Sequence, residues 1–497
     1  MKAISVLNVI VLALLLLVSS PAIAKMGSGE VDTGSSNVNM EIFGSLKSYP
    51  HFIGNVDFNQ GDTKYDYLID ENGIIDNDEV TVRNQFRLGF KGGGDNWSFS
   101  SILEADFSLS KGNIDRGSRQ GEIDNLGMTG EDFGVEKLKF TYDFSSYGVP
   151  ATLKTGWSTN HLDLETGGIL YGDDHPFVGL CGKVNKVKWD VMTLFINDAI
   201  GDAGSRNDSF GDVTPASRGD SDQNNWTAYT AKMVIPVNNL NISPMYAYSD
   251  NRARNAEVHY MGLQAYGQMG MFAPQAEFVY AVGEKDNYNA TGTQKDADIS
   301  AYGGYAAVVA NVSDALNPYV GGYMLSGDDD ASDDEVNAYN PITNISRYSG
   351  PFGMENAMIY RGVPVLGSPL YGNAPERAGA NTGYGGISND ASAENPGLQS
   401  LGIGTKGTCK NWSYKAQLQY FWFEDTGALE DVTSRTNDID NAIGYEGDMQ
   451  ITYNFSDNFS LGNVISVFDP GDGVEDLRGP NYDAVAVVDT IEMKWNF

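Results

Sequence analysis

Six basic residues occur where polar and apolar side chains alternate along the chain. Arg83 and Arg87, for example, alternate with the apolar residues of the run 82–90. Successive side chains of a β-strand point to opposite faces, so such bases would share one polar face. The chemistry they can carry is the electrostatic steering of charged solutes. The six bases are Lys47, Arg83, Arg87, Lys137, Lys139 and Lys154.

Catalytic and metal-binding patterns are missing from the sequence. The four histidines are scattered, and no Gly-x-Ser-x-Gly element opens a helix. Cys181 and Cys409 provide neither a disulfide framework nor a Cys-x-x-Cys motif. With 32 Lys and Arg against 66 Asp and Glu, the net charge of −34 excludes a protein that binds nucleic acid by neutralising phosphates. We therefore expect no enzyme, no metal site and no nucleic-acid partner.

The first 24 residues predict export. Lys2 precedes an apolar run from Val6 to Val18, and Ala22-Ile23-Ala24 supplies a small-x-small cleavage site. This order is typical of a secretory signal peptide, and the run is too short for a membrane-spanning helix. A short segment (25–37) follows it. The exported chain would then be soluble or would insert in a membrane as a β-barrel.

The last residues favour the barrel. Ile491, Met493, Trp495 and Phe497 alternate strictly with polar residues. A soluble edge strand would show the same alternation, whereas in a transmembrane barrel the apolar face meets lipid and the aromatic residues form an interfacial girdle. The sequence here resembles the Gram-negative outer-membrane porins, whose last strand ends in Phe after such alternation. The resemblance implies a bacterial outer-membrane location.

The same alternation recurs along 38–497, and long and short connections alternate between the runs. It predicts an all-β, antiparallel transmembrane barrel of about 18 strands, with 16 as the alternative, and with nine long loops and eight short turns. Three short turns share Asn before an aromatic residue and then Ser, at 96–98, 411–413 and 458–460. Asn tolerates the left-handed turn conformation, and the aromatic residue would begin a strand at the membrane interface.

In porins the loop after the fifth strand commonly folds into the barrel. That resemblance implies that the loop 159–175 lies inside the channel and turns its acidic residues toward the basic wall. The acidic residues are Asp163, Glu165, Asp173 and Asp174. Opposed charges across a narrow channel create a transverse field that orients dipolar solutes. The alternative is a loop that stays outside and bases that are ordinary lumen residues.

The segment from Tyr171 to Leu180 is similar to the loop-to-strand passage of homotrimeric porins from sulfate-reducing bacteria. This resemblance covers about 83–200 and implies a homotrimer. Acidic loops at 66–79 and 328–335 can hold weakly bound Ca²⁺, or they can be solvated loops that share divalent cations with lipopolysaccharide. The long loop 326–396 could cap the pore or contact a neighbouring subunit.

Three functions remain open. The first is a water-filled porin for passive diffusion of small hydrophilic solutes and ions. The second is a substrate-specific channel of the same fold, which would need lumen aromatics for sugars or a basic ladder for anions. The third is a non-transport barrel, either an adhesin or a sheath for an electron-transfer partner. No haem motif occurs in the chain, so the third function would need a partner protein.

Overall fold

We describe the fold from a computed structural model. The residues that it describes are 29–31, 38–54, 58, 60, 81–109, 129–130, 134–164, 169–197, 226–252, 255–288, 295–330, 332–344, 350–354, 396–432 and 438–497. The expected signal peptide (1–24), the loop 66–79 and most of the segment 25–37 lie outside these ranges. Within them, no helix combines the length and the apolar character that crossing a membrane requires.

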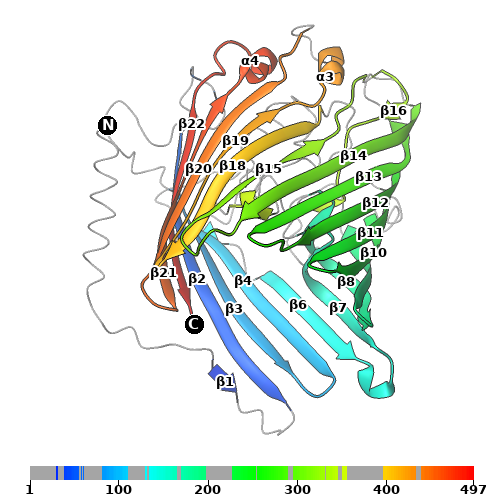
Figure 1. Ribbon diagram of the computed structural model, residues 1–497, viewed down its shortest axis with the longest axis vertical. Coiled ribbons are helices and arrows are strands. Elements are labelled where there is room, and N and C mark those ends of the chain that lie inside the picture. Colours follow the sequence, from blue (N-terminus) through cyan, green and yellow to red (C-terminus); the bar gives the residue numbers. More distant parts are fainter. Residues whose placement is uncertain are drawn as a thin grey trace.

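Eighteen antiparallel strands form one closed barrel, so the predicted strand number is confirmed and the alternative of 16 is wrong. Figure 1 shows them as a continuous wall that runs from blue to red. The barrel strands are β2 (Asn39–Gly54), β3 (Thr81–Gly93), β4 (Trp97–Leu109), β6 (Gly134–Asp143), β7 (Ala151–His161), β8 (Tyr171–Val184), β9 (Val187–Asn197), β10 (Trp226–Val237), β11 (Leu240–Asn251), β12 (Ala256–Gly267), β13 (Phe272–Tyr288), β14 (Lys295–Ala310), β15 (Asn317–Leu325), β18 (Leu398–Cys409), β19 (Trp412–Trp422), β20 (Ala442–Asn454), β21 (Phe459–Pro470) and β22 (Ala486–Asn496).

The described residues also form four very short strands and four short helical turns. The strands are β1 (Gly29–Val31), β5 (Thr129–Gly130), β16 (Glu335–Val336) and β17 (Thr343–Asn344). The helical turns are η1 (Ser145–Tyr147), η5 (Gly350–Phe352), α3 (Gly427–Val432) and α4 (Asp472–Arg478). Both α3 and α4 lie at the end of the barrel where the long loops emerge (Figure 1).

The alternation of residue types explains why these segments are strands of a membrane barrel. Leu138 and Leu418 face outward and are 53% and 51% exposed, whereas Gln419, the neighbour of Leu418, faces inward and is 2% exposed. This pattern is the reverse of a water-soluble sheet protein, in which the apolar face is buried. An apolar outer surface and a polar inner wall are the arrangement of transmembrane barrels.

The barrel closes where β2 pairs with β22. Antiparallel pairing joins Ser45 to Asn496, and the amide of Gly44 donates to the carbonyl of Phe497 at 2.8 Å. Beyond Phe497 the same edge of β2 is taken over by β1, which pairs Gly29 with Ile42 and Val31 with Met40. Two separate segments, one from each end of the chain, therefore share one edge of β2.

Short and long connections alternate as expected, with three exceptions. The connection between β13 and β14, on the long-loop side, spans only 289–294 and is shorter than the turn 144–150 between β6 and β7. The connection between β11 and β12 spans only 252–255, although it lies on the long-loop side. The connection between β7 and β8 spans 162–170 and is shorter than the predicted loop 159–175. Pairing between the two strands continues from Thr159↔Asp174 to His161↔Gly172, because polar side chains do not prevent a strand from extending.

Candidate functional site: the lumen wall and two inserted segments

The predicted bases belong to the strands of one sector of the inner wall. The guanidinium of Arg87 on β3 pairs with two carboxylates, those of Glu104 on β4 and Glu136 on β6, the latter at 2.7 Å. Lys154 Nζ lies 2.5 Å from Asp190 Oδ2 on β9. The sector is therefore a mixed surface of bases and carboxylates, rather than the purely basic patch that the sequence suggests.

The remaining predicted bases are placed by the strand register. Lys47 on β2 pairs with Gln85 and with Lys494, so two lysines from opposite ends of the chain lie side by side. Lys137 pairs with Ile102. Lys139 pairs with Ser100 and Gly156. Arg83 pairs through its backbone with Tyr49 and Ser108, and its side chain lies outside the described residues.

The inward position of Glu136 could not be predicted from the alternation of residue types, because it results from a β-bulge between β4 and β6. The register between β4 and β6 shifts between Ile102 and Leu103, so that Ile102 pairs with Lys137 and Leu103 with Val135. Glu136 is the extra residue of this bulge, and its carboxylate reaches Arg87. Strict alternation would have put Glu136 and Lys137 on opposite faces.

Three further lysines continue the basic sector, and the sequence analysis did not single them out. Lys183 pairs with Lys188 across β8 and β9, and Lys188 pairs with Val234 two residues from Lys232 on β10. A cavity of about 560 Å³ opens between these strands and is lined by Cys181, Lys183, Lys188, Asp190 and Lys232. All three lysines alternate with apolar residues on β8–β10, so the alternation in the sequence is the signal that predicts their inward position.

Of the four predicted acidic residues, Asp163 is the one whose side chain the structure describes. The Asp163 carboxylate accepts hydrogen bonds from the backbone amides of Leu170 (2.8 Å) and Tyr171 (3.1 Å). It therefore joins the two ends of the connection between β7 and β8. Burial raises the pKa of this carboxyl, and the hydrogen bonds only partly offset that effect. Asp173 and Asp174 belong to β8, where their backbones pair with Asn160 and Thr159. The side chains of Asp173 and Asp174 and the whole of Glu165 lie outside the described residues.

The described part of the connection 162–170 packs against the inner wall of β10–β14. Leu162, Ile169 and Leu170 are at most 1% exposed. Lys232 donates to the carbonyl of Leu162 at 2.5 Å, and Gln264 on β12 donates to the same carbonyl at 2.7 Å. A Cβ atom at Gly303 on β14 would lie 2.7 Å from Ile169 Cγ2, so the wall needs glycine at that position.

A second segment enters the barrel after β15. Residues Val336, Tyr339 and Ile342 are at most 1% exposed, and β16 pairs in parallel with the first part of β14 through Ile299↔Val336. The hydroxyl of Tyr339 donates to the carbonyl of Ile169 at 2.8 Å, and the amide of Ile342 donates to the carbonyl of Leu170 at 2.9 Å. The two inserted segments are thus bonded to each other.

The second segment also reaches β15, β18 and β19. Phe352 is 2% exposed, and its ring meets that of Tyr319 edge-on, with the centroids 5.2 Å apart. Gln417 on β19 donates to the carbonyl of Phe352 at 3.1 Å, and Lys415 donates to that of Gly353. Of the stretch 326–396, whose role the sequence left open, Val336, Tyr339, Ile342 and Phe352 therefore pack against the inner wall, whereas Asp328 and Asp329 contact α3 at the long-loop end.

Asp328 is the most unusual group of this second segment. It is 0% exposed, and its Oδ2 atom has no hydrogen-bond partner. Its Oδ1 atom accepts a long bond of 3.4 Å from the amide of Asp330, and the amide of Asn337 also donates to this carboxylate. Burial, together with the nearby charges of Asp333 and Asp329, raises the pKa of Asp328 to about 7. Among the described residues, no three His, Cys, Asp or Glu side chains converge to hold a metal ion.

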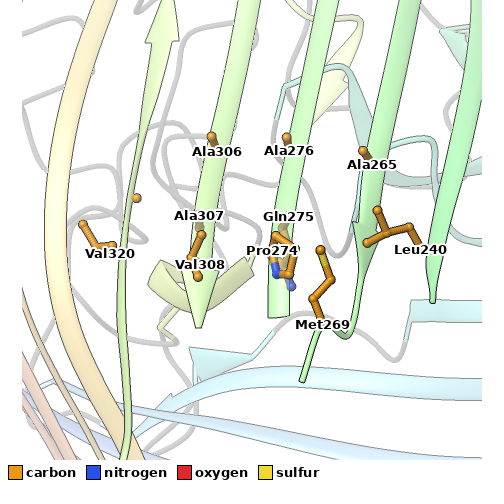
Figure 2. Close-up of a pocket in the computed structure, with 11 residues that line it drawn as sticks. Leu240, Ala265, Met269, Pro274, Gln275, Ala276, Ala306, Ala307, Val308 and Val320 are labelled. Carbon is orange, nitrogen blue, oxygen red and sulfur yellow. The ribbon is translucent and has the colours of Figure 1, made fainter. Parts of the chain in front are cut away.

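A separate groove lies on the outer wall and does not belong to the lumen. Figure 2 shows Ala265, Ala276 and Ala306 in a row across β12, β13 and β14, with Val320 on β15 at one side. The groove has a volume of about 500 Å³ and forms because small side chains stand between exposed large ones such as Leu263. Its lining is almost entirely apolar, as expected of a surface that faces lipid.

A closed barrel of 18 antiparallel strands, with an apolar outer surface, a polar inner wall and segments folded into the lumen, defines the fold of the Gram-negative outer-membrane porins. The predicted porin fold is confirmed. No protein-family model matches the chain, and no curated protein matches its sequence.

Solved structures of outer-membrane channels share the fold. The chain is similar to OccK9 (OpdG) from Pseudomonas aeruginosa with a TM-score of 0.50 and 10% identity, covering 92% of this chain and 98% of that one. It is similar to OccAB3 from Acinetobacter baumannii with a TM-score of 0.50 and 9% identity, covering 92% and 99%. These likenesses concern the fold. The similarity to porins of sulfate-reducing bacteria stays a prediction.

Proposed function

We propose that the protein is a channel of the bacterial outer membrane that passes small hydrophilic solutes and ions by diffusion through its lumen. The observation that carries this proposal is the pair of inserted segments, which occupy part of the lumen and face a charged wall. In strand order β3 is the second and β13 the eleventh of 18 strands, so Arg87 and Glu277 stand half-way round the barrel from each other. Solutes would pass between them.

The constriction has one charged side and one side built by the inserted segments. The charged side comprises Arg87, Lys137 and Lys139 with the carboxylates of Glu104 and Glu136. The opposite side is built by the described parts of the inserted segments, 162–164, 169–170 and 332–342. The electric field across the passage would then come mostly from the charged wall. This field would orient dipolar solutes as they pass, as the field between two oppositely charged walls would.

A channel that prefers anions is the second candidate, because of one observation. Six lysines lie on the inner register of β6–β10, against the described inward carboxylates of Glu136, Asp143 and Asp190 on the same strands. The six are Lys137, Lys139, Lys154, Lys183, Lys188 and Lys232. Such a surplus raises the local concentration of anions even in a chain of net charge −34. This candidate is the substrate-specific alternative of the sequence analysis, in its basic-ladder form.

The finer expectations also remain proposals. We propose a homotrimer, contact of the acidic outer loops with lipopolysaccharide, and weak Ca²⁺ binding by those loops. We propose transport rather than catalysis, and export directed by residues 1–24. The adhesin and the sheath for an electron-transfer partner gain no support from the geometry of the lumen.

Single-channel recording tests the proposal. Purified protein in a planar bilayer under a tenfold KCl gradient should give stable current steps, and groups of three steps would support the trimer. The sign of the reversal potential separates an anion preference from a cation preference. Silence from protein whose folding is verified by heat-modifiable gel migration would refute the channel.

A further inference from the structure

Three wall residues hold the segment 162–170 at points where its backbone would otherwise be unpaired. Lys232 Nζ lies 2.5 Å from the carbonyl oxygen of Leu162 and 3.4 Å from that of Asp163. Gln264 Nε2 lies 2.7 Å from the Leu162 carbonyl. The amide of Leu164 donates to Glu277 Oε2 at 3.2 Å. Donors and acceptor come from β10, β12 and β13, so the segment is held from three strands.

These contacts are buried, which makes them costly to leave unsatisfied. Gln264 is 1% exposed and Glu277 is 3% exposed. The charges of Asp163 and Glu277 lie beside Lys232, so one ammonium group faces two carboxyl groups. A buried polar group that loses its partner keeps its desolvation cost with no bond to offset it. The cluster therefore favours one position of the segment over others.

The fold around this cluster leaves little freedom for a different position. Asp163 bonds the amides of Leu170 and Tyr171, which ties the two ends of the connection together. On its other side the segment is bonded to Tyr339 and Ile342. Side chains of the wall cluster hold the segment 162–170 against β10, β12 and β13, and Tyr260 on β12 donates to the carbonyl of Asn340 in the second segment at 3.0 Å.

We infer that Lys232, Gln264 and Glu277 are positioning residues that fix the inserted segment 162–170 at one distance from the barrel wall, and thereby set the width of the lumen. The statement about lumen width rests on the proposed channel function, whereas the statement about the position of the segment does not. Lys232 acts here through its bonds to the segment in addition to its charge, which distinguishes it from the other lysines of the sector.

Hydrogen exchange and single-channel recording on the full-length folded protein separate these statements. Lys232→Met should speed the exchange of the Leu170 and Tyr171 amides about tenfold, because the segment opens more often. It should also add current noise and sub-conductance levels. Gln264→Leu should do the same to a smaller degree. Lys232→Arg, which keeps a charged donor, should restore native exchange.

The matched control is Lys183→Met, which removes the same charge at the turn end of β8. It should shift ion selectivity in the same direction as Lys232→Met while leaving the exchange of 169–171 unchanged. Equal exchange in both variants, with native migration on gels, would overturn the inference. If native protein passes no current but the exchange differs as expected, the proposed channel fails and the positioning role stands.

Glu277 is tested by a conservative pair. Glu277→Gln keeps an oxygen acceptor for the Leu164 amide and should retain native exchange and quiet currents. Glu277→Leu removes the acceptor and should loosen the segment. Identical behaviour of the two variants would exclude Glu277 from the positioning cluster.

Discussion

The hydroxyl of Tyr339 donates a hydrogen bond of 2.8 Å to the carbonyl of Ile169, a residue 170 positions earlier in the chain. Both residues are at most 1% exposed, and both side chains lie over Gly303 on β14. The contact joins the connection after β7 to the segment after β15. The two segments therefore form one body inside the barrel, and a change in either is expected to affect the other.

Removing that single hydroxyl tests this coupling. Tyr339→Phe keeps the ring over Gly303 but leaves the Ile169 carbonyl without its donor, at a cost of about 1–3 kcal/mol. Amide exchange should rise in 169–171 as well as in 336–342. Tyr280→Phe is the control, because the Tyr280 hydroxyl meets Ser300 on an exposed part of the wall. Exchange that rises only around position 339 would contradict the coupling.

Neutralising Arg87 should shift the channel toward cations. Arg87→Gln leaves the carboxylates of Glu104 and Glu136 without the guanidinium that now pairs with both. The reversal potential under a KCl gradient should move in the cation-selective direction. Lys91→Gln removes an equal charge near the turn end, where Lys91 pairs with Glu41 at 2.9 Å, and should move it less. A reversal potential that stays unchanged in Arg87→Gln would place Arg87 outside the path of ions.

Raising the pH should loosen the segment after β15. The pKa of Asp328 rises from 3.8 to about 7 mainly through burial, so the folded protein retains a proton that the unfolded chain has released in this interval. The stability contributed by the neutral carboxyl is complete below pH 3.8 and is lost progressively as the pH approaches 7. Protection factors of the amides in 326–330 and 427–432 should fall accordingly.

Asp328→Asn should remove that pH dependence, because the amide side chain is neutral throughout. Asp333→Asn is the matched control, because it deletes one nearby negative charge and should keep the pH dependence but move it to a lower pH. The midpoint should fall, since loss of the Asp333 charge makes ionisation of Asp328 easier. Protection that is flat in native protein between pH 4 and 8 would refute the assignment.

The outer face of β19 should reject charge. Leu418 is 51% exposed and faces lipid, so Leu418→Arg should cost about 2–4 kcal/mol if the position is near the bilayer midplane. Urea unfolding of the protein in lipid vesicles measures this change. Leu418→Ala keeps the position apolar and should cost much less. A tolerated arginine would mean that this part of the wall is not in contact with lipid.

The barrel could be predicted because the residue types along each strand alternate between those suited to lipid and those suited to the lumen. Leu138 and Lys139, or Leu418 and Gln419, differ in type because one faces lipid and the other faces the lumen. Strand number follows from counting such runs. Strand ends do not, since pairing such as Asn160↔Asp173 continues beyond the apolar part.

The lumen could be predicted only in part. Lys232, Gln264 and Glu277 look like ordinary inward residues of separate strands, and nothing local links them to a segment 69 to 113 positions earlier. Asp163 is acidic as the constriction hypothesis requires, yet its carboxylate is used by the amides of Leu170 and Tyr171. Glu136 faces Arg87 because of a bulge that alternation cannot reveal.

The short strand β1 has a consequence for the rim of the barrel. Residues 40–42 of β2 extend past the end of β22, and unpaired amides and carbonyls on a strand edge are a template on which another chain can add a strand. Gly29–Val31 occupies that template from within the same chain. The pairing with β1 thereby protects this edge of β2 against edge-to-edge aggregation.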